Sequence, residues 1–246
     1  MSKKIVSIDV GIKNLAYCII EKIPNSDKKR DFKILDWGII NILDDKLNNA
    51  PKCTNFLKNR ICNKLATNIV KINDDNFYFC DKITCQKSMK VKYPKNKSKK
   101  IKIPTTKNTS LLELSSILFK KLLEIKEKFI DIDEVIIENQ PVLKNPTMKS
   151  IQMVLYSYFI EHGYINSCSK INNIHLFSAR NKLKLYDGPT IDCKISDKYK
   201  KRKFLSIEYT KYYLDLNPDY KEFFLSHKKQ DDLADSFMQG YYYLFK

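Results

Sequence analysis

The chain has 246 residues, and its 45 Lys and Arg against 28 Asp and Glu give a formal net charge of +17 at pH 7. This length suffices for one elaborated domain with a real core, and so large a positive charge favours nucleic acid or an anionic membrane surface as a partner. Because no stretch reaches the ~18 apolar residues of a membrane span and no signal or transit peptide opens the sequence, we expect a soluble, intracellular protein with no membrane partner.

Three apolar runs near the amino end predict strands at residues 5–8, 14–20 and 32–42. They are rich in β-branched residues, and a short turn with Gly11 joins the first two. Their close spacing predicts an antiparallel meander.

Residues 44–107 break this regularity with four cysteines and a Lys-rich run that contains no acid between Lys82 and Leu112. We expect 45–107 to be an insertion within a single domain of residues 1–246, rather than a separate fold. Within it we expect a zinc-binding segment at 53–85 and a basic arm at 86–107. The alternative for the arm is a solvated loop in a chain generally rich in lysine.

Helices and strands alternate after the insertion. Ser110 and Glu113 form a capping-box pattern before leucines at helical spacing, up to residue 125. Further expected elements are a strand at 134–139, a helix at 146–161 ended by Gly163, a strand at 171–177, and helices at 196–216 and 230–245. This order predicts a mixed α/β fold, with the meander and parallel strands in one central sheet flanked by helices.

Acidic residues stand at the ends of several apolar elements. Asp9 ends the first strand, Glu138 ends the strand "VIIE", and Asp231, Asp232 and Asp235 open the last helix. Spacings of i, i+3 and i, i+4 do not choose between Asp231 and Asp232 as the partner of Asp235.

Gathered carboxylates repel unless a divalent cation neutralises them, and Mg²⁺ prefers oxygen ligands. Such a set can hold two metals for phosphodiester hydrolysis. The simpler alternative is structural, because acids in a first helical turn favour the helix dipole and Asp9 can serve as a turn residue.

The segments "SIDVGIKNLAYCII", "VIIENQPVLKNPTMKSIQ" and "KQDDLADSF" occur in this order. Together they resemble the RuvC-like Holliday junction resolvases, most of all the branch of poxviruses and other large cytoplasmic DNA viruses. The resemblance implies a ribonuclease H-like fold and a homodimeric endonuclease that cuts four-way DNA junctions with Mg²⁺ or Mn²⁺. It also implies a role in viral DNA recombination, replication or genome processing, in the host cytoplasm if the source is viral.

Carried over by motif, the four catalytic and metal-binding acids are Asp9, Glu138, Asp232 and Asp235, with Asp231 as a reserve ligand. The resemblance also places the dimer interface on the helix at 147–161, although a core helix explains its apolar stripe equally well. Val142 and Leu143 would pry at the bases of the junction.

The insertion holds two cysteine pairs, Cys53 with Cys62 and Cys80 with Cys85. Four thiolates make a closed tetrahedral site that suits structural Zn²⁺, although these spacings are looser than paired CxxC motifs. The segment has too few large apolar residues to fold alone, so a metal could supply the missing stability. The alternative is four unrelated cysteines.

Basic residues near the expected acid cluster are candidates for contacts to the DNA backbone. These are Lys144, Lys149, Arg180, Lys182, Lys184, Lys198 and Lys201. Lys182, with Arg180 and Lys184, would lie nearest the acids and steer the scissile phosphate, and Lys203 could also reach the backbone.

Other functions remain open at this level. One is a zinc-containing, non-catalytic DNA-binding protein with structural acids, and another is a general ribonuclease H-like nuclease that acts on RNA–DNA hybrids. An actin-like ATPase or sugar kinase shares the Asp-x-Gly hairpin but needs glycine-rich phosphate loops, and the later glycines of this chain are isolated. A comparison of junction, hybrid and linear duplex as substrates would separate the nucleases.

Overall fold

The computed structural model describes residues 2–24, 31–143, 145–216 and 218–246. The chain divides into two compact units, which we call the sheet unit (Met1–Ile42 with Leu111–Lys246) and the insertion unit (Leu43–Ser110). The insertion begins and ends close to the expected 45–107, but it forms a compact unit of its own rather than an elaboration of the domain around it.

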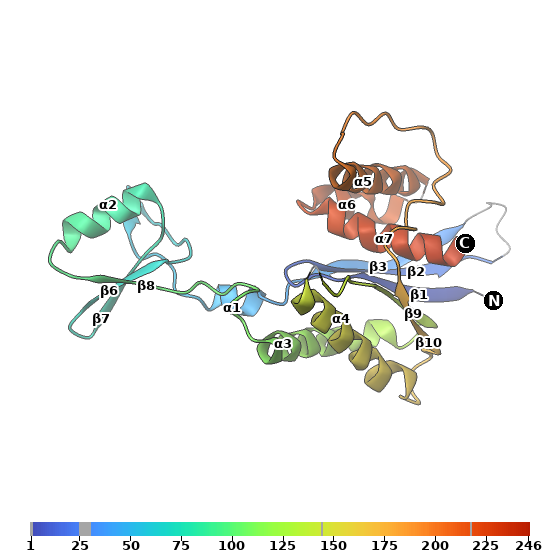
Figure 1. Cartoon of the computed structure of the whole chain (residues 1–246), viewed down its shortest axis with the longest axis horizontal. Coiled ribbons are helices and arrows are strands. Elements are labelled where there is room, and N and C mark those ends of the chain that lie inside the picture. Colours follow the sequence, from blue (N-terminus) through green and yellow to red (C-terminus); the bar gives the residue numbers. More distant parts are fainter. Residues whose placement is uncertain (1, 25–30, 144, 217) are drawn as a thin grey trace. The chain divides into compact units, whose positions relative to one another are not determined.

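A mixed sheet of five strands forms the centre of the sheet unit (Figure 1). Its order is β10-β9-β1-β2-β3, in which β1, β2 and β3 are antiparallel and β9 runs parallel to both β1 and β10. The predicted meander with added parallel strands, a ribonuclease H-like arrangement, is therefore confirmed. The strands are β1 (Lys3–Asp9), β2 (Leu15–Lys22), β3 (Phe32–Ile40), β9 (Glu134–Glu138) and β10 (Asn173–Phe177).

Helices cover both faces of this sheet, which explains why β1 and β9 read as nearly continuous apolar runs. In Figure 1 the red and brown helices α5, α6 and α7 lie over one face, and the green and olive helices α3 and α4 lie over the other. These elements are α3 (Leu111–Glu124), α4 (Pro146–Phe159), α5 (Lys198–Leu216), α6 (Lys221–Ser226) and α7 (Gln230–Phe245), with short turns η1 (Lys126–Phe129), η2 (Ile160–Tyr164) and η3 (Pro218–Tyr220).

Gly163 does not end the helix that follows β9, contrary to expectation. The chain continues past α4 as the π-helical turn η2, which includes this glycine. A Cβ at Gly163 would lie 2.8 Å from Ile171 Cδ1, so the glycine allows the turn to pack against the residues that precede β10.

The core beneath α7 is aromatic and centres on Trp37 of β3. Its ring stacks on Phe224 with centroids 5.3 Å apart, and its indole N–H donates to Ser236 Oγ at 3.2 Å. Because this single polar atom is satisfied by a residue of α7, burial of the large ring also fixes α7 on the sheet.

The insertion unit has its own three-stranded sheet, in the order β7-β6-β8, and a small apolar cluster of Val70, Phe79 and Met89. Part of the segment 86–107, which we expected to form a basic arm, is regular structure: α2 covers its start, and β8 pairs antiparallel with β6. Burial of Cys85 and Met89, one helical turn apart, anchors α2. The elements are α1 (Asp44–Asn48), β4 (Phe56–Leu57), β5 (Arg60–Ile61), β6 (Asn68–Ile72), β7 (Asp75–Phe79), α2 (Ile83–Lys92) and β8 (Ser98–Lys100).

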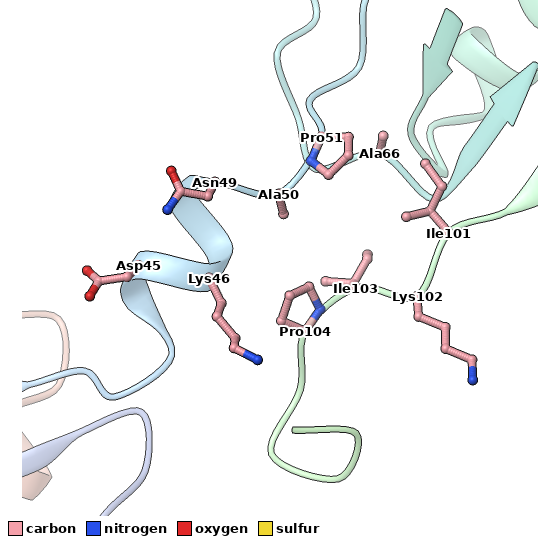
Figure 2. Close-up of a pocket in the computed structure, with 10 residues that line it drawn as sticks. All are labelled: Asp45, Lys46, Asn49, Ala50, Pro51, Ala66, Ile101, Lys102, Ile103 and Pro104. Carbon is pink, nitrogen blue, oxygen red and sulfur yellow. The ribbon is translucent and has the colours of Figure 1, made fainter. Parts of the chain in front are cut away.

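The two ends of the insertion unit approach each other. Figure 2 shows residues that follow α1 facing residues 101–104, with a pocket of about 320 Å³ between them. Its walls are mainly Ala50, Pro51, Ile101, Ile103 and Pro104. The first and last segments of the insertion unit therefore line one pocket.

Candidate active site

Parallel pairing of β1 with β9 places two acids at one end of the sheet. Ile8 lies opposite Ile137, so Asp9 and Glu138 follow at the same edge. Burial raises the pKa of the Asp9 carboxyl well above its ordinary value, and the carboxylates of Glu138 and Asp235 raise it further. Three acids from β1, β9 and α7 therefore share one electrostatic site.

Close contact between α7 and β1 brings Asp235 to this site. A Cβ at Gly240 would lie 2.9 Å from Ser7 Cβ, so only glycine permits this approach. Asp235 lies five residues before Gly240, about 7.5 Å along a helix, and Asp9 lies two residues after Ser7, about 6.6 Å along a strand. The glycine contact thus sets α7 in register with the end of β1.

A buried glutamine strengthens the same contact. The amide nitrogen Nε2 of Gln239 lies 3.1 Å from Ser7 Oγ, 3.2 Å from the carbonyl oxygen of Ile8 and 3.3 Å from that of Ile136. One α7 side chain therefore holds β1 and β9 just before their terminal acids.

Asp235 has two partners of its own. Lys182 Nζ lies 2.5 Å from Oδ2, and Ser206 Oγ of α5 donates to Oδ1 at 2.6 Å. Burial would lower the pKa of Lys182, but the carboxylates of Asp235, Asp9 and Glu138 outweigh burial and raise it. Lys182 is thus a buried cation within the acid cluster, as its predicted place near the acids suggests.

The two remaining acids of α7 differ in their surroundings. Asp231 forms an ion pair with Lys203 of α5, which lowers the Asp231 pKa although burial alone would raise it. Burial and the neighbouring Asp231 raise the pKa of Asp232, and its buried Oδ2 has no hydrogen-bond partner in the described part of the chain. An unsatisfied carboxylate oxygen fits a cation ligand, so these surroundings favour Asp232 where spacing left the choice open.

Glu138 is held by the residues that follow it. Gln140 Nε2 donates to Glu138 Oε2 at 2.5 Å, and the backbone N–H of Gln140 donates to Gln152 Oε1 at 2.8 Å. Lys149, predicted to bind DNA, donates instead to Asn139 Oδ1 at 3.0 Å and to Gln152. Sequence reasoning missed Gln140, Gln152 and Ser206 as supports, although Gln140 belongs to the "ENQ" motif.

Several other predicted residues lie outside this cluster. Val142 and Leu143 are 61% and 95% exposed. We expected Lys203 to be free to contact the DNA backbone, but it forms an ion pair with Asp231. Lys144 lies outside the described residues. Of the other basic residues predicted to bind DNA, the exposed ones are Arg180, Lys184, Lys198 and Lys201.

Most of the apolar stripe on α4 is used within the chain. Ile151, Leu155, Tyr158 and Phe159 are buried, and Tyr158 packs edge-on against Phe119 of α3 at 5.3 Å. Met153 stays 43% exposed.

The four cysteines of the insertion come together. Their Sγ atoms all lie within 4.8 Å of one another, and Cys62 Sγ is 3.7 Å from Cys80 Sγ. Thiolates at 2.3 Å from a tetrahedral Zn²⁺ would be roughly 3.8 Å apart, so the spacing fits such a site. Burial raises the pKa of Cys80 to about 12, so its thiol stays protonated unless a bound cation stabilises the thiolate.

Within the described residues, no helix combines the length and the apolarity needed to cross a bilayer.

One family model matches more than half of the chain. Residues 5–162 match the family described as mitochondrial resolvase Ydc2 / RNA splicing MRS1. The chain is 29% identical to the uncharacterized protein L451 of Acanthamoeba polyphaga mimivirus, over 98% of this chain and 74% of that protein.

Two solved structures are similar. The yeast mitochondrial Holliday junction resolvase Ydc2 matches with a TM-score of 0.50 and 15% identity, over 99% of this chain and 79% of its own. The fowlpox virus resolvase in complex with Holliday junction DNA matches with a TM-score of 0.48 and 18% identity, over 98% and 96%.

Proposed function

Because the chain belongs to the family of the mitochondrial resolvase Ydc2 and the RNA-splicing protein MRS1, we propose that it is a structure-selective, metal-dependent endonuclease that resolves four-way DNA junctions. The family description names a nuclease and a splicing protein, so the chain's own residues must decide between them.

The convergence of Asp9, Glu138 and Asp235 carries the proposal. Burial and mutual repulsion raise the pKa of Asp9, which costs stability in a protein without metal. A splicing scaffold or a non-catalytic DNA-binding protein gains nothing from this cost, whereas strongly perturbed carboxylates are typical of catalytic sites.

Asp9, Glu138, Asp232 and Asp235 would hold Mg²⁺ or Mn²⁺, because they supply only hard oxygen donors. When bound, the metal supplies an activated water and stabilises the leaving oxygen in phosphodiester hydrolysis. Asp231 stays with Lys203 and fixes the first turn of α7.

The remaining residues position and neutralise the site. Ser206 and Gln140 orient the carboxylates of Asp235 and Glu138, which makes them positioning residues. Lys182 offsets part of the negative charge at Asp235, and its ammonium would attract the scissile phosphate to the site.

Branched DNA would be held by exposed residues around this site. The flexible basic side chains suit phosphate contacts, and Val142 and Leu143 suit an apolar wedge against bases at the branch point. A homodimer through 147–161, using the exposed part around Met153, would supply two active sites for a junction that needs two cuts. These exposed basic side chains are Arg180, Lys184, Lys198 and Lys201.

The four cysteines would bind one structural Zn²⁺. The 3.7 Å separation of Cys62 Sγ and Cys80 Sγ supports this proposal. The metal would stabilise an insertion unit whose apolar cluster is small.

Cleavage of three substrates in one assay tests the function. With Mg²⁺, we expect the protein to cut a synthetic four-way junction and to leave a linear duplex and an RNA–DNA hybrid of the same sequence largely intact. Asp9→Asn and Glu138→Gln should abolish cutting while junction binding persists. Tight binding without cutting in any divalent metal would support the non-catalytic alternative, and preferred cutting of the hybrid would support a ribonuclease H-like nuclease.

A further inference from the structure

The positive charge of the chain is concentrated in the insertion unit. Leu43–Ser110 carries sixteen Lys and Arg against five Asp and Glu, a net charge of +11, whereas the rest of the chain carries +6. A general preference for lysine in the chain would give both units a similar density of positive charge, so it does not explain this difference. The charge instead marks the smaller unit as the one with the stronger attraction for a polyanion.

A groove on this unit gathers four of these basic residues. It is lined by residues 57–64 together with Lys82 and Thr84, has a volume of about 1060 Å³, and includes no acidic residue. Lys58, Arg60, Lys64 and Lys82 are all exposed, and none of them forms an ion pair with a described residue. Since no charged group in the described part of the chain pairs with these four side chains, they are available to a ligand.

The cysteine cluster fixes the shape of the groove. Arg60 and Lys64 lie two residues before and after Cys62, and Lys82 lies two residues after Cys80. The backbone N–H of Cys53 donates to the carbonyl of Lys64 at 2.7 Å, and the N–H of Cys62 donates to that of Asn55 at 2.9 Å. These bonds tie the chain around the cysteines, so Lys58, Arg60 and Lys64 project from a closed hairpin rather than from a loose arm.

We infer that this groove binds the phosphate backbone of a DNA arm, independently of base sequence. Lysines act as point charges for phosphate and the Arg60 guanidinium can bind two phosphate oxygens at once. Exposed Phe56 and Ile61 are cross-strand partners on the same hairpin, at 59% and 57% exposure, and offer an apolar contact for deoxyribose. The inference rests on the proposed function only for the choice of DNA as the polyanion.

The test measures binding of a labelled linear duplex by the full chain, without added divalent ions, as a function of salt. The groove variant is Lys58→Gln, Arg60→Gln, Lys64→Gln and Lys82→Gln together. The matched control removes the same charge from the same unit outside the groove: Lys71→Gln, Lys87→Gln, Lys90→Gln and Lys97→Gln. Unchanged thiol reactivity of the four cysteines and an unchanged circular dichroism spectrum would show that both variants fold.

Four lost phosphate contacts should reduce the slope of log K against log salt by about 3.6. Doubling the salt should then weaken wild-type binding about tenfold more than it weakens the groove variant. The control should keep most of the wild-type slope, and a variant with Arg at all four positions should restore it. If the groove variant and the control lose equal amounts of DNA affinity, the attraction comes from diffuse charge and not from the groove. If the groove variant binds DNA as tightly as the wild type, the inference is also refuted. If the wild type binds duplex RNA more tightly than duplex DNA, and the groove substitutions weaken that binding, then the ligand is RNA and not DNA.

These outcomes are distinct from those that test the nuclease. A groove variant that binds weakly should still cut a junction at saturating protein concentration, because Asp9, Glu138 and Asp235 are unchanged. Asp9→Asn should bind normally and fail to cut. Loss of cutting by every form of the protein would therefore refute the nuclease and leave the groove measurement intact.

Discussion

Replacing Asp9 by Asn separates cleavage from stability. In the metal-free protein, the carboxylates of Glu138 and Asp235 repel the half-buried Asp9, and Lys182 attracts it. To first order, the attraction of Lys182 cancels one of the two repulsions. The other repulsion and the burial of the Asp9 charge still oppose folding. Asn has nearly the same shape and cannot ionise, so it removes both without leaving a cavity.

The magnitude follows from these contacts. A like-charge contact at about 4 Å costs about 4 kcal/mol at an effective dielectric constant of 20. Partial protonation of Asp9 and its remaining exposure reduce the gain to about 1–2 kcal/mol, within the range that single stabilising substitutions commonly give. For a chain of this size, each kcal/mol raises Tm by about 2–4 °C, so we expect Tm to rise by about 2–8 °C without divalent ions.

Thermal unfolding with and without Mg²⁺ checks this reasoning. At a Mg²⁺ concentration ten times its Kd, the wild type should gain about 1.4 kcal/mol, and Asp9→Asn should lose most of that gain together with junction cleavage. A lower Tm of the variant in metal-free buffer, or an equal response of both proteins to Mg²⁺, would refute a repulsive metal site at Asp9.

The dependence on pH has a defined sign. The folded-state pKa of Asp9 lies above its ordinary value of 3.8, so protonation of Asp9 favours the folded state. This contribution is fully present below the unfolded-state pKa and is lost as pH rises through the folded-state pKa. The Tm advantage of Asp9→Asn should therefore grow as pH rises from about 4 towards neutrality.

Three further predictions concern other parts of the structure. Glu138→Gln should abolish junction cleavage. Gln140→Ala removes only the 2.5 Å hydrogen bond to Glu138, so it should slow single-turnover cleavage and leave junction binding unchanged. Equal effects of the two substitutions on cleavage would contradict the assigned roles. A thiol reagent that modifies the four cysteines should release one zinc per chain. Cys80→Ser should make residues 43–110 sensitive to limited proteolysis, because the metal would stabilise this unit. A zinc-free protein whose insertion unit resists protease would exclude the structural metal. Gly240→Ala should lower the free energy of unfolding by about 1–3 kcal/mol in urea denaturation and reduce cleavage, because its Cβ would lie 2.9 Å from Ser7 Cβ; Ala at the exposed helical position Ser157 is the control, and wild-type behaviour of Gly240→Ala would contradict the tight contact.

The sheet unit was largely predictable because its signals are local. The run before Asp9, the strand before Glu138 and the helix 230–245 each show their periodicity within a short window, and the structure places α7 at Gln230–Phe245. The approach of Asp235 to Asp9 follows less directly, since it depends on a glycine and a glutamine that contact β1 from another part of the sequence.

Other features depend on contacts between distant segments. The preference for Asp232 over Asp231 that we propose rests on the ion pair between Asp231 and Lys203 of α5, which no spacing within α7 reveals. The elements inside the insertion unit escaped prediction for a different reason: β4 and β5, for example, have two residues each, too few for any periodicity. Their position is set by cysteines that meet only in the folded chain.

The separation of donor atoms between the two units has a consequence for metal selectivity. Asp9, Glu138, Asp232 and Asp235 offer only hard oxygen donors, and the insertion unit offers only soft sulfur donors at its cluster. Softness sorts divalent ions: thiolates prefer zinc, and carboxylates accept magnesium or manganese. Because neither set mixes its donors, the thiolates would take zinc ahead of the carboxylates, and a limited supply of zinc would leave the acids to the more abundant magnesium.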